Sequence, residues 1–211
     1  VPFLLKDLGV QLKGTVTSNG SRFYADRVAD YSSTVVQRYQ AAGLNIFGKS
    51  ASPEVGQIPN TVSTLYGKTR NPWNLEYSAG GSSGGAAAAV AAGILPAAHA
   101  TDGGGSIRVP ASCCGLFGLK PSRGRTVPLG RPSGPVEISS SHAVSISVRD
   151  SAHWLAFTER TGADRVFDPV GLVGAPSSRR LRIALDLEPL AGNALDPEVR
   201  TAIEDTGRKC E

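Results

Sequence analysis

Two glycine clusters on either side of an alanine-rich run constrain this chain more than any other feature of its sequence. The first reads GGSSGG over residues 80–85, the run Ala86–Ala92 follows at once, and DGGGS occupies residues 102–106. Glycine and serine alone are typical of flexible linkers, but linkers do not usually bracket a good helix former. Because glycine adopts backbone angles that are closed to other residues, the clusters indicate two loops in which the chain can approach a small molecule closely.

The elements expected around these loops alternate as in an α/β protein. Short apolar runs indicate strands, and apolar residues at helical spacing between capping residues indicate helices. The predicted strands are residues 1–6, 44–50, 97–101, 116–120 and 181–185, and the predicted helices are residues 29–43, 83–92, 106–115, 147–162 and 196–210. This order predicts a mixed β-sheet flanked by helices on both faces. The segments 57–79 and 121–135 are expected to be irregular, the second as an ordered surface loop.

The composition excludes several classes of protein. The 211 residues are 40% hydrophobic and 19% charged, as in ordinary soluble globular proteins. The net charge of +4 comes without a basic cluster interleaved with aromatic residues, so we expect no nucleic acid partner. The longest apolar stretch, residues 86–98, contains Gly93 and Pro96 and is shorter than the roughly 20 residues that span a bilayer, so we expect no membrane partner.

The cysteines and the start of the chain bear on compartment and completeness. Cys113, Cys114 and Cys210 have no spacing typical of a disulfide framework or a zinc site, so we expect a cytoplasmic location, no metal and no cofactor. The chain has no methionine, and its first residue already lies in a predicted strand. We therefore expect a fragment of a longer protein.

One short motif matches a phosphate-binding pattern without its structural context. Residues 43–50, GLNIFGKS, satisfy GxxxxGK[ST]. That loop needs a strand before the first glycine and a helix after the lysine. Here a helix precedes Gly43, an apolar strand fills the intervening positions, and Pro53 interrupts any helix after Lys49. The sequence therefore favours no nucleotide site at this motif.

A second short motif suggests a serine hydrolase of a different kind. Residues 81–85, GSSGG, match GxSxG with Ser83 as the nucleophile, which would require an acid and a histidine later in the chain. His142, His153 and Asp150 follow, but the segment before the motif is a poor strand and His153 lies in a predicted amphipathic helix. A Ser-His-Asp hydrolase remains an alternative.

The second glycine cluster fits the chemistry of acyl transfer. Gly103, Gly104 and Gly105 precede Ser106 at the start of a predicted helix, where backbone N–H groups carry partial positive charge. Glycines allow consecutive N–H groups to converge on one point, as in an oxyanion hole beside a nucleophile. A serine needs a base, and no histidine is well placed. A buried lysine, whose pKa desolvation lowers, is the remaining candidate.

The stretch GGSSGGAAAAVAAGILPAAHATDGGGSIRVPASCCGLFGLKPSRGR, residues 80–125, resembles the signature of the amidase signature hydrolases, and the likeness extends from PFLLKD to SVRD. In that family a lysine, a serine in a cis peptide and a nucleophilic serine form a triad that works through an acyl-enzyme. The resemblance implies that Lys6 is the base, Ser82 the proton relay and Ser106 the nucleophile. It implies supporting roles for Ser83, Thr101, Asp102 and Arg108.

The resemblance also implies a fold, a reaction and a substrate class. Residues 1–211 would form a single amidase signature domain, truncated at both ends, that hydrolyses linear or cyclic amide C–N bonds of a small molecule. We expect a homodimer as the assembly of the intact protein. The segments TRNPWNLE and ASCCGL look closest to bacterial amidases, including 6-aminohexanoate cyclic-dimer hydrolases. The alternative within the family is the A subunit of glutamyl-tRNA amidotransferase, which usually has glutamine at the position of Val109 and threonine at that of Gly103.

Overall fold

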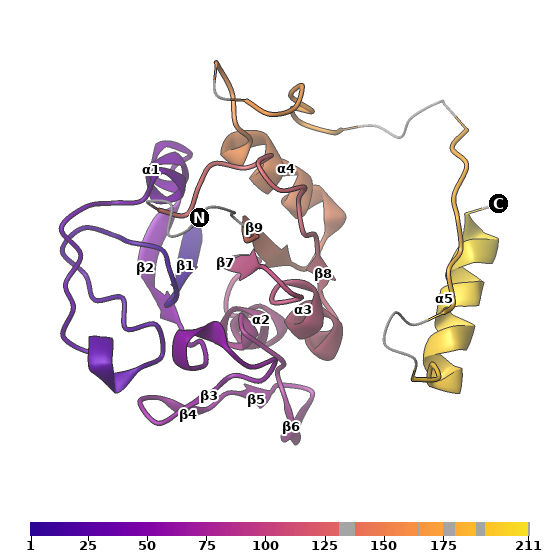
Figure 1. Ribbon diagram of the computed structural model, residues 1–211, viewed down its shortest axis with the longest axis horizontal. Coiled ribbons are helices and arrows are strands. Elements are labelled where there is room, and N and C mark those ends of the chain that lie inside the picture. Colours follow the sequence, from indigo (N-terminus) through magenta and orange to yellow (C-terminus); the bar gives the residue numbers. More distant parts are fainter. Residues whose placement is uncertain (131–137, 164, 175–179, 189–192, 211) are drawn as a thin grey trace. The chain divides into compact units, whose positions relative to one another are not determined.

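The computed structural model describes residues 1–130, 138–163, 165–174, 180–188 and 193–210, which belong to two compact units, Val1–Gly174 and Ala175–Glu211 (Figure 1). The first unit contains the strands and the helices α1 to α4, and the second contains helix α5 (Pro197–Lys209). The expectation of a single domain over the whole chain stays a prediction.

The first unit begins with a parallel strand pair. After strand β1 (Pro2–Lys6) and a long connection over residues 7–33, helix α1 (Thr34–Ala41) follows, and the chain returns as β2 (Asn45–Ser50), which pairs with β1 in parallel. Parallel strands need such a crossover, because the chain must travel back to the same end of the sheet. Gly43 ends the helical segment with a φ of +78°, which glycine adopts without strain. The strands and the helix expected here are confirmed, but the helix begins at Thr34 and not at residue 29.

A three-stranded antiparallel sheet follows, in the order β7-β9-β8. Helix α2 (Gly84–Ala91) precedes β7 (Ala97–Asp102), and helix α3 (Arg108–Cys114) leads into β8 (Phe117–Gly118). The central strand β9 (Ser140–Ser145) was not expected, because its serines resemble loop composition. All six of its residues are buried, and it pairs with β7 along its whole length, so tertiary pairing decides its structure.

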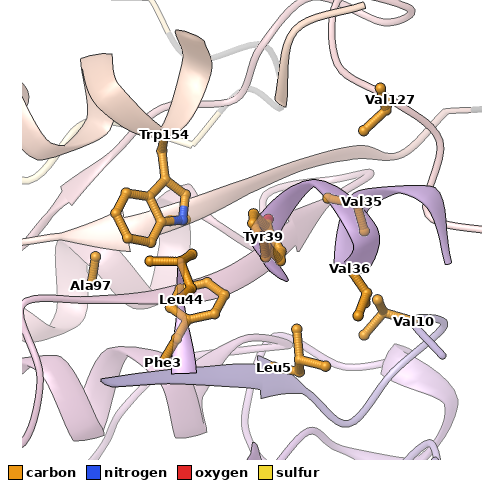
Figure 2. Close-up of a cluster of buried hydrophobic side chains, with 11 residues drawn as sticks. Phe3, Leu5, Val10, Val35, Val36, Tyr39, Leu44, Ala97, Val127 and Trp154 are labelled. Atoms are coloured by element: carbon orange, nitrogen blue, oxygen red, sulfur yellow. The ribbon is translucent and has the colours of Figure 1, made fainter. Parts of the chain in front are cut away.

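Helices cover both faces of these strands. Phe3 and Leu5 of β1 belong to one buried cluster together with Tyr39 of α1 and Trp154 of α4 (Val148–Thr158), as Figure 2 shows. A second cluster joins alternate residues of β7 and β9 to the helices α2 and α3. Its strand members are Ala98, Ala100 and Val144. Because side chains alternate along a strand, both faces are buried, and the predicted sheet with helices on each side is confirmed.

Capping residues set the bounds of the last two helices. Ser147 accepts the N–H of Asp150 at 3.1 Å and starts α4, as expected. The expected end at Gly162 is wrong: α4 stops at Thr158, because Glu159 is extended and its carboxylate accepts hydrogen bonds from Arg125 and two backbone N–H groups. Asp196 caps α5 by accepting the N–H of Glu198 at 2.8 Å, as expected.

Two regions differ from the expectation. Residues 181–185 form no strand, because a strand needs a neighbour to accept its hydrogen bonds and no described segment pairs with them.

The segment 57–79, expected to be irregular, contains two short hairpins, whose strands were too short to give a periodic pattern. They pair β3 (Val62–Ser63) with β4 (Gly67–Lys68), and β5 (Arg70–Asn71) with β6 (Asn74–Ser78). The 3₁₀ turns η1 (Arg22–Tyr24) and η2 (Glu54–Gly56) complete the elements, and residues 131–135 of the expected loop lie outside the described ranges.

The part of the chain that the structure describes contains neither a membrane span nor a cluster of metal ligands. None of its helices combines the length and the apolar character needed to cross a bilayer. Within the same residues, no three histidine, cysteine or acidic side chains lie close enough together to hold a metal ion.

Candidate active site

Strand β1 ends with a lysine whose amine lies inside the protein. Lys6 is fully buried, and its Nζ donates to Ser82 Oγ at 2.8 Å and to Thr101 Oγ1 at 3.0 Å. Lys6 and Ser82 are 76 residues apart in the sequence, so the packing of β1 against the α2 region creates this contact. Two of the three residues implied as a triad are therefore hydrogen-bonded to each other.

The environment of Lys6 favours the neutral amine. Burial lowers the pKa of Lys6 from 10.5 to about 7, although the nearby negative charge of Asp102 acts in the opposite direction. About half of the amine is then unprotonated near neutral pH, whereas an ordinary lysine would be almost wholly charged. The lowered pKa expected of a buried lysine is confirmed.

Asp7, next to Lys6 in the chain, binds a different set of groups. Its carboxylate accepts the backbone N–H of Ser18 at 2.8 Å, the Ser18 hydroxyl, and the Tyr66 hydroxyl at 3.3 Å. Consecutive strand residues point to opposite faces, so the Asp7 carboxylate is directed away from the amine of Lys6.

The first glycine cluster forms a tight loop around Ser82. The peptide bond between Gly81 and Ser82 is cis, as the resemblance implies. A Cβ atom on Gly81 would lie 2.6 Å from the backbone nitrogen of Asn60, and one on Gly85 would lie 2.5 Å from the backbone of Ala51. Such distances are too short for any side chain. The glycines of this cluster therefore allow close approach between backbones, and they do not form a linker.

Thr61 holds both ends of this loop and was not recognised from the sequence. Its hydroxyl donates to the carbonyl of Gly80 at 2.9 Å and accepts the N–H of Gly84 at 3.0 Å, so it bridges the residues on either side of Ser82. Its own N–H also donates to the Gly80 carbonyl at 3.1 Å. Nothing in the spacing of the segment 57–79 marks this threonine, because the contact depends on tertiary folding.

Ser83, the nucleophile of the alternative motif, has a structural set of contacts. It is fully buried and lies within 3.4 Å of both the backbone carbonyl and the backbone N–H of Thr101. His153 is exposed on α4, and His142 bonds to Ser151. Asp150 caps α4. Within the described residues, neither of these histidines is hydrogen-bonded to Ser83, so the geometry does not support a Ser-His-Asp site.

The second glycine cluster wraps around Asp102. The carboxylate accepts the N–H groups of Gly105 at 2.6 Å, Ile107 at 3.2 Å and Arg108 at 3.4 Å. The guanidinium of Arg108 adds two more bonds, from Nε at 2.9 Å and from an Nη at 3.1 Å. Burial raises the pKa of Asp102, but these hydrogen bonds outweigh it and hold the pKa at about 2. Asp102 is therefore a permanent anion that shapes the loop.

This loop determines which N–H groups can face a ligand. The N–H of Gly105 already donates to Asp102, so Gly105 shapes the loop in this conformation and is not available as an oxyanion donor. The N–H groups of Gly103 and Gly104 have no acceptor among the residues that the structure describes. Ser106 is partly buried, and its hydroxyl likewise has no hydrogen-bond partner within the described ranges. The role of Gly103 and Gly104 as an oxyanion hole stays a prediction.

The residues of the phosphate-loop pattern form a regular strand. Gly43 follows α1, and residues 45–50 are strand β2. Lys49 Nζ donates to the carbonyl of Val16 and to Thr17 Oγ1 at 2.5 Å. No loop of exposed N–H groups is present in this described segment, which agrees with the sequence-based interpretation.

Comparisons with known proteins agree with this architecture. The family model described as Amidase matches residues 1–211. The chain is 39% identical over 220 residues to the 6-aminohexanoate-cyclic-dimer hydrolase of Paenarthrobacter ureafaciens, covering 96% of this chain and 43% of that protein. It is 52% identical over 124 residues to the lipoamidase of Enterococcus faecalis, covering 59% of this chain and 17% of that protein.

A solved structure of 6-aminohexanoate cyclic dimer hydrolase complexed with substrate superposes with a TM-score of 0.84 at 36% identity, covering 100% of this chain and 46% of that one. The chain thus spans less than half the length of these relatives. Solved structures of amidase signature enzymes share its fold. With the family model matching along its whole length, the chain belongs to the Amidase family.

Proposed function

We propose that this chain carries the catalytic site of an amidase that hydrolyses a carboxylic amide C–N bond, with Ser106 as nucleophile, Ser82 as proton relay and Lys6 as base. The observation that carries the proposal is the 2.8 Å hydrogen bond from the buried Lys6 Nζ to Ser82 Oγ. A lysine with a pKa of about 7 can accept a proton near neutral pH.

The proposed reaction has two halves. Ser106 Oγ attacks the amide carbonyl carbon while its proton passes to Ser82 and the Ser82 proton passes to Lys6. The tetrahedral oxyanion faces the N–H groups of Gly103 and Gly104. The C–N bond then breaks, and the departing amine takes the proton back along the same path. Water attacks the resulting acyl-enzyme in the same way, which releases the carboxylic acid and restores Ser106.

Four other groups support the site in this proposal. Thr101 holds the amine of Lys6, and Ser83 joins the start of α2 to the backbone of β7. Asp102 and Arg108 hold the glycine loop in the shape that presents Ser106. These contacts fix positions and transfer no protons.

The proposed substrate is a small linear or cyclic amide, and the acceptor is water. A relative that is 39% identical to this chain over 220 aligned residues is named 6-aminohexanoate-cyclic-dimer hydrolase, and such a cyclic dimer is a small amide. We propose that the reaction needs no metal, cofactor or partner subunit, and that the assembly to test first is a homodimer. Three free cysteines favour the cytoplasm.

Active-site labelling tests the nucleophile. A fluorophosphonate probe incubated with the full-length gene product should label Ser106, as located by peptide mass mapping. Ser106→Ala should abolish turnover on an amide panel, with Ser112→Ala, a serine of α3 outside the site, as the matched control. Labelling of Ser83, or a loss of about 10⁴-fold in His142→Ala or His153→Ala, would replace this mechanism with a histidine-based one.

Partner dependence tests the alternative within the family. The purified protein should hydrolyse simple amides alone, without ATP or charged tRNA. Val109 and Gly103 stand where the amidotransferase A subunit usually has glutamine and threonine, which favours the independent enzyme. Activity that appears only after partner subunits are added would support the amidotransferase instead.

A further inference from the structure

We propose that His99 is a positioning residue for Lys6, because its neutral imidazole holds the lysine main chain and so fixes the amine against Ser82. This inference rests on the proposed function, in which Lys6 is the base. His99 was not singled out from the sequence, and it touches neither Ser82 nor Ser106 through a hydrogen bond among the described residues.

The contacts of His99 define both the position of the ring and its tautomer. His99 is fully buried on β7, and its Nδ1 accepts the backbone N–H of Lys6 at 3.2 Å. Its Nε2 lies 3.0 Å from Ser141 Oγ on the neighbouring strand β9. Because Nδ1 accepts a hydrogen bond, the single proton of the neutral ring lies on Nε2, which donates to Ser141.

The imidazole of His99 accepts a backbone N–H, that of Lys6, which has no backbone acceptor on the neighbouring strands that the structure describes. In the described sheet, β1 pairs only with β2, and the N–H of Asp7 donates to the carbonyl of Ser50 on β2 at 2.9 Å. Along a strand, successive N–H groups point to opposite sides, so the N–H of Lys6 points away from β2 and toward β7. A buried N–H without an acceptor is unfavourable, and His99 supplies that acceptor.

A neutral ring is needed for this role. A doubly protonated imidazole would donate from Nδ1, lose the bond to Lys6 and add a positive charge next to the amine. The groups that face His99 are Lys6 on β1, His142 on β9 and the ring of Tyr39 on α1, at 5.7 Å between centroids. Burial, followed by the charges of Lys6 and His142, lowers the pKa of His99 to about 3. His99 therefore stays neutral while Lys6 titrates.

The position of the lysine main chain matters because the amine is held at the end of a flexible stem. The titratable groups that face Lys6 are Asp102, whose carboxylate is paired with Arg108, and the neutral His99. If the main chain of Lys6 loses its acceptor, the segment can shift and admit water to the amine. The pKa of Lys6 would then rise toward 10.5, and less of the neutral base would remain at pH 7.

The test compares two buried histidines on one sheet. His142 is also fully buried and bonds to a serine, Ser151, at 2.7 Å, but no hydrogen bond joins it to Lys6 in the described structure. In the full-length gene product, kcat/KM is measured against pH for wild type, His99→Leu and His142→Leu, with thermal unfolding of each. The acid limb of the kcat/KM profile of His99→Leu should move to a pH higher by about one unit or more, with a loss of about fivefold or more at pH 7 that recovers at alkaline pH. His142→Leu should lose stability and keep the wild-type limb.

A milder variant covers the case in which His99→Leu does not fold. Ser141→Ala removes the acceptor that selects the tautomer, so its acid limb should move in the same direction by a smaller amount. An unshifted limb in whichever of these two variants folds, or an equal shift in His142→Leu, would overturn the proposal. Lys6→Ala distinguishes failure of the proposed function from failure of the role of His99. If Lys6→Ala retains activity, the proposed function fails. If Lys6→Ala is inactive and the acid limb of His99→Leu is unshifted, only the role of His99 is refuted.

Discussion

Replacing Lys6 with methionine should change how the stability of the protein depends on pH. The pKa of Lys6 is lowered from 10.5 to about 7 in the folded state. Between these two values the unfolded chain binds a proton that the folded protein has released. The free energy of unfolding therefore rises with pH across this window, and Lys6 lowers stability most below pH 7.

The magnitude follows from the shift. Each pKa unit corresponds to about 1.4 kcal/mol, so the charged lysine should lower the free energy of unfolding by roughly 5 kcal/mol below pH 7. Integrated from pH 6 to pH 10, the contribution changes by about 4 kcal/mol. Lys6→Met also leaves the hydroxyls of Ser82 and Thr101 without their donor, but that effect does not depend on pH in this range. The pH dependence of the difference in the free energy of unfolding between wild type and Lys6→Met therefore reports the titration of Lys6 alone.

Urea unfolding of both proteins, followed by the fluorescence of the buried Trp154, measures this difference. Wild type should gain about 4 kcal/mol relative to Lys6→Met as the pH rises from 6 to 10, with most of the change between pH 7 and 10. Lys49→Met, on the adjacent strand, serves as a control for the loss of a half-buried lysine. Parallel pH dependences of wild type and Lys6→Met would show that the amine is not desolvated in the folded protein.

Two further predictions concern the glycine loops. The pKa of Asp102 is lowered from 3.8 to about 2, so its carboxylate should contribute about 2 kcal/mol above pH 4 that is lost as the pH falls toward 2. Acid titration of the free energy of unfolding should show this loss in wild type, and Asp102→Asn should lack it. Gly81→Ala should destabilise the protein by about 1 to 3 kcal/mol, because its Cβ would meet the backbone of Asn60 at 2.6 Å. Gly104→Ala, where no atom lies within 4 Å of the added Cβ, should be nearly neutral in urea unfolding, and equal losses in both would refute the steric argument.

Local chemistry in the sequence predicted most of the elements that hold the site. The strand that ends at Lys6, the helix that ends before Gly43 and the cap at Ser147 each depend on neighbouring residues, and each is observed. Strand β9 and the missing strand at residues 181–185 could not be predicted in this way. Pairing decides both of them: β9 has a partner along its length, and residues 181–185 have none among the described segments.

The sequence by itself determined the chemical types at the site and the two glycine loops, because motif spacing and glycine conformation are local properties. Only the tertiary structure decided which groups meet. Thr61 bridges Gly80 and Gly84, and His99 accepts the N–H of Lys6 across 93 residues of sequence. The pKa of Lys6 is also decided by the tertiary structure, because burial lowers it and the packing of distant segments produces that burial. Long-range contacts of this kind leave no periodic pattern in the chain, so they can be read only from the folded protein.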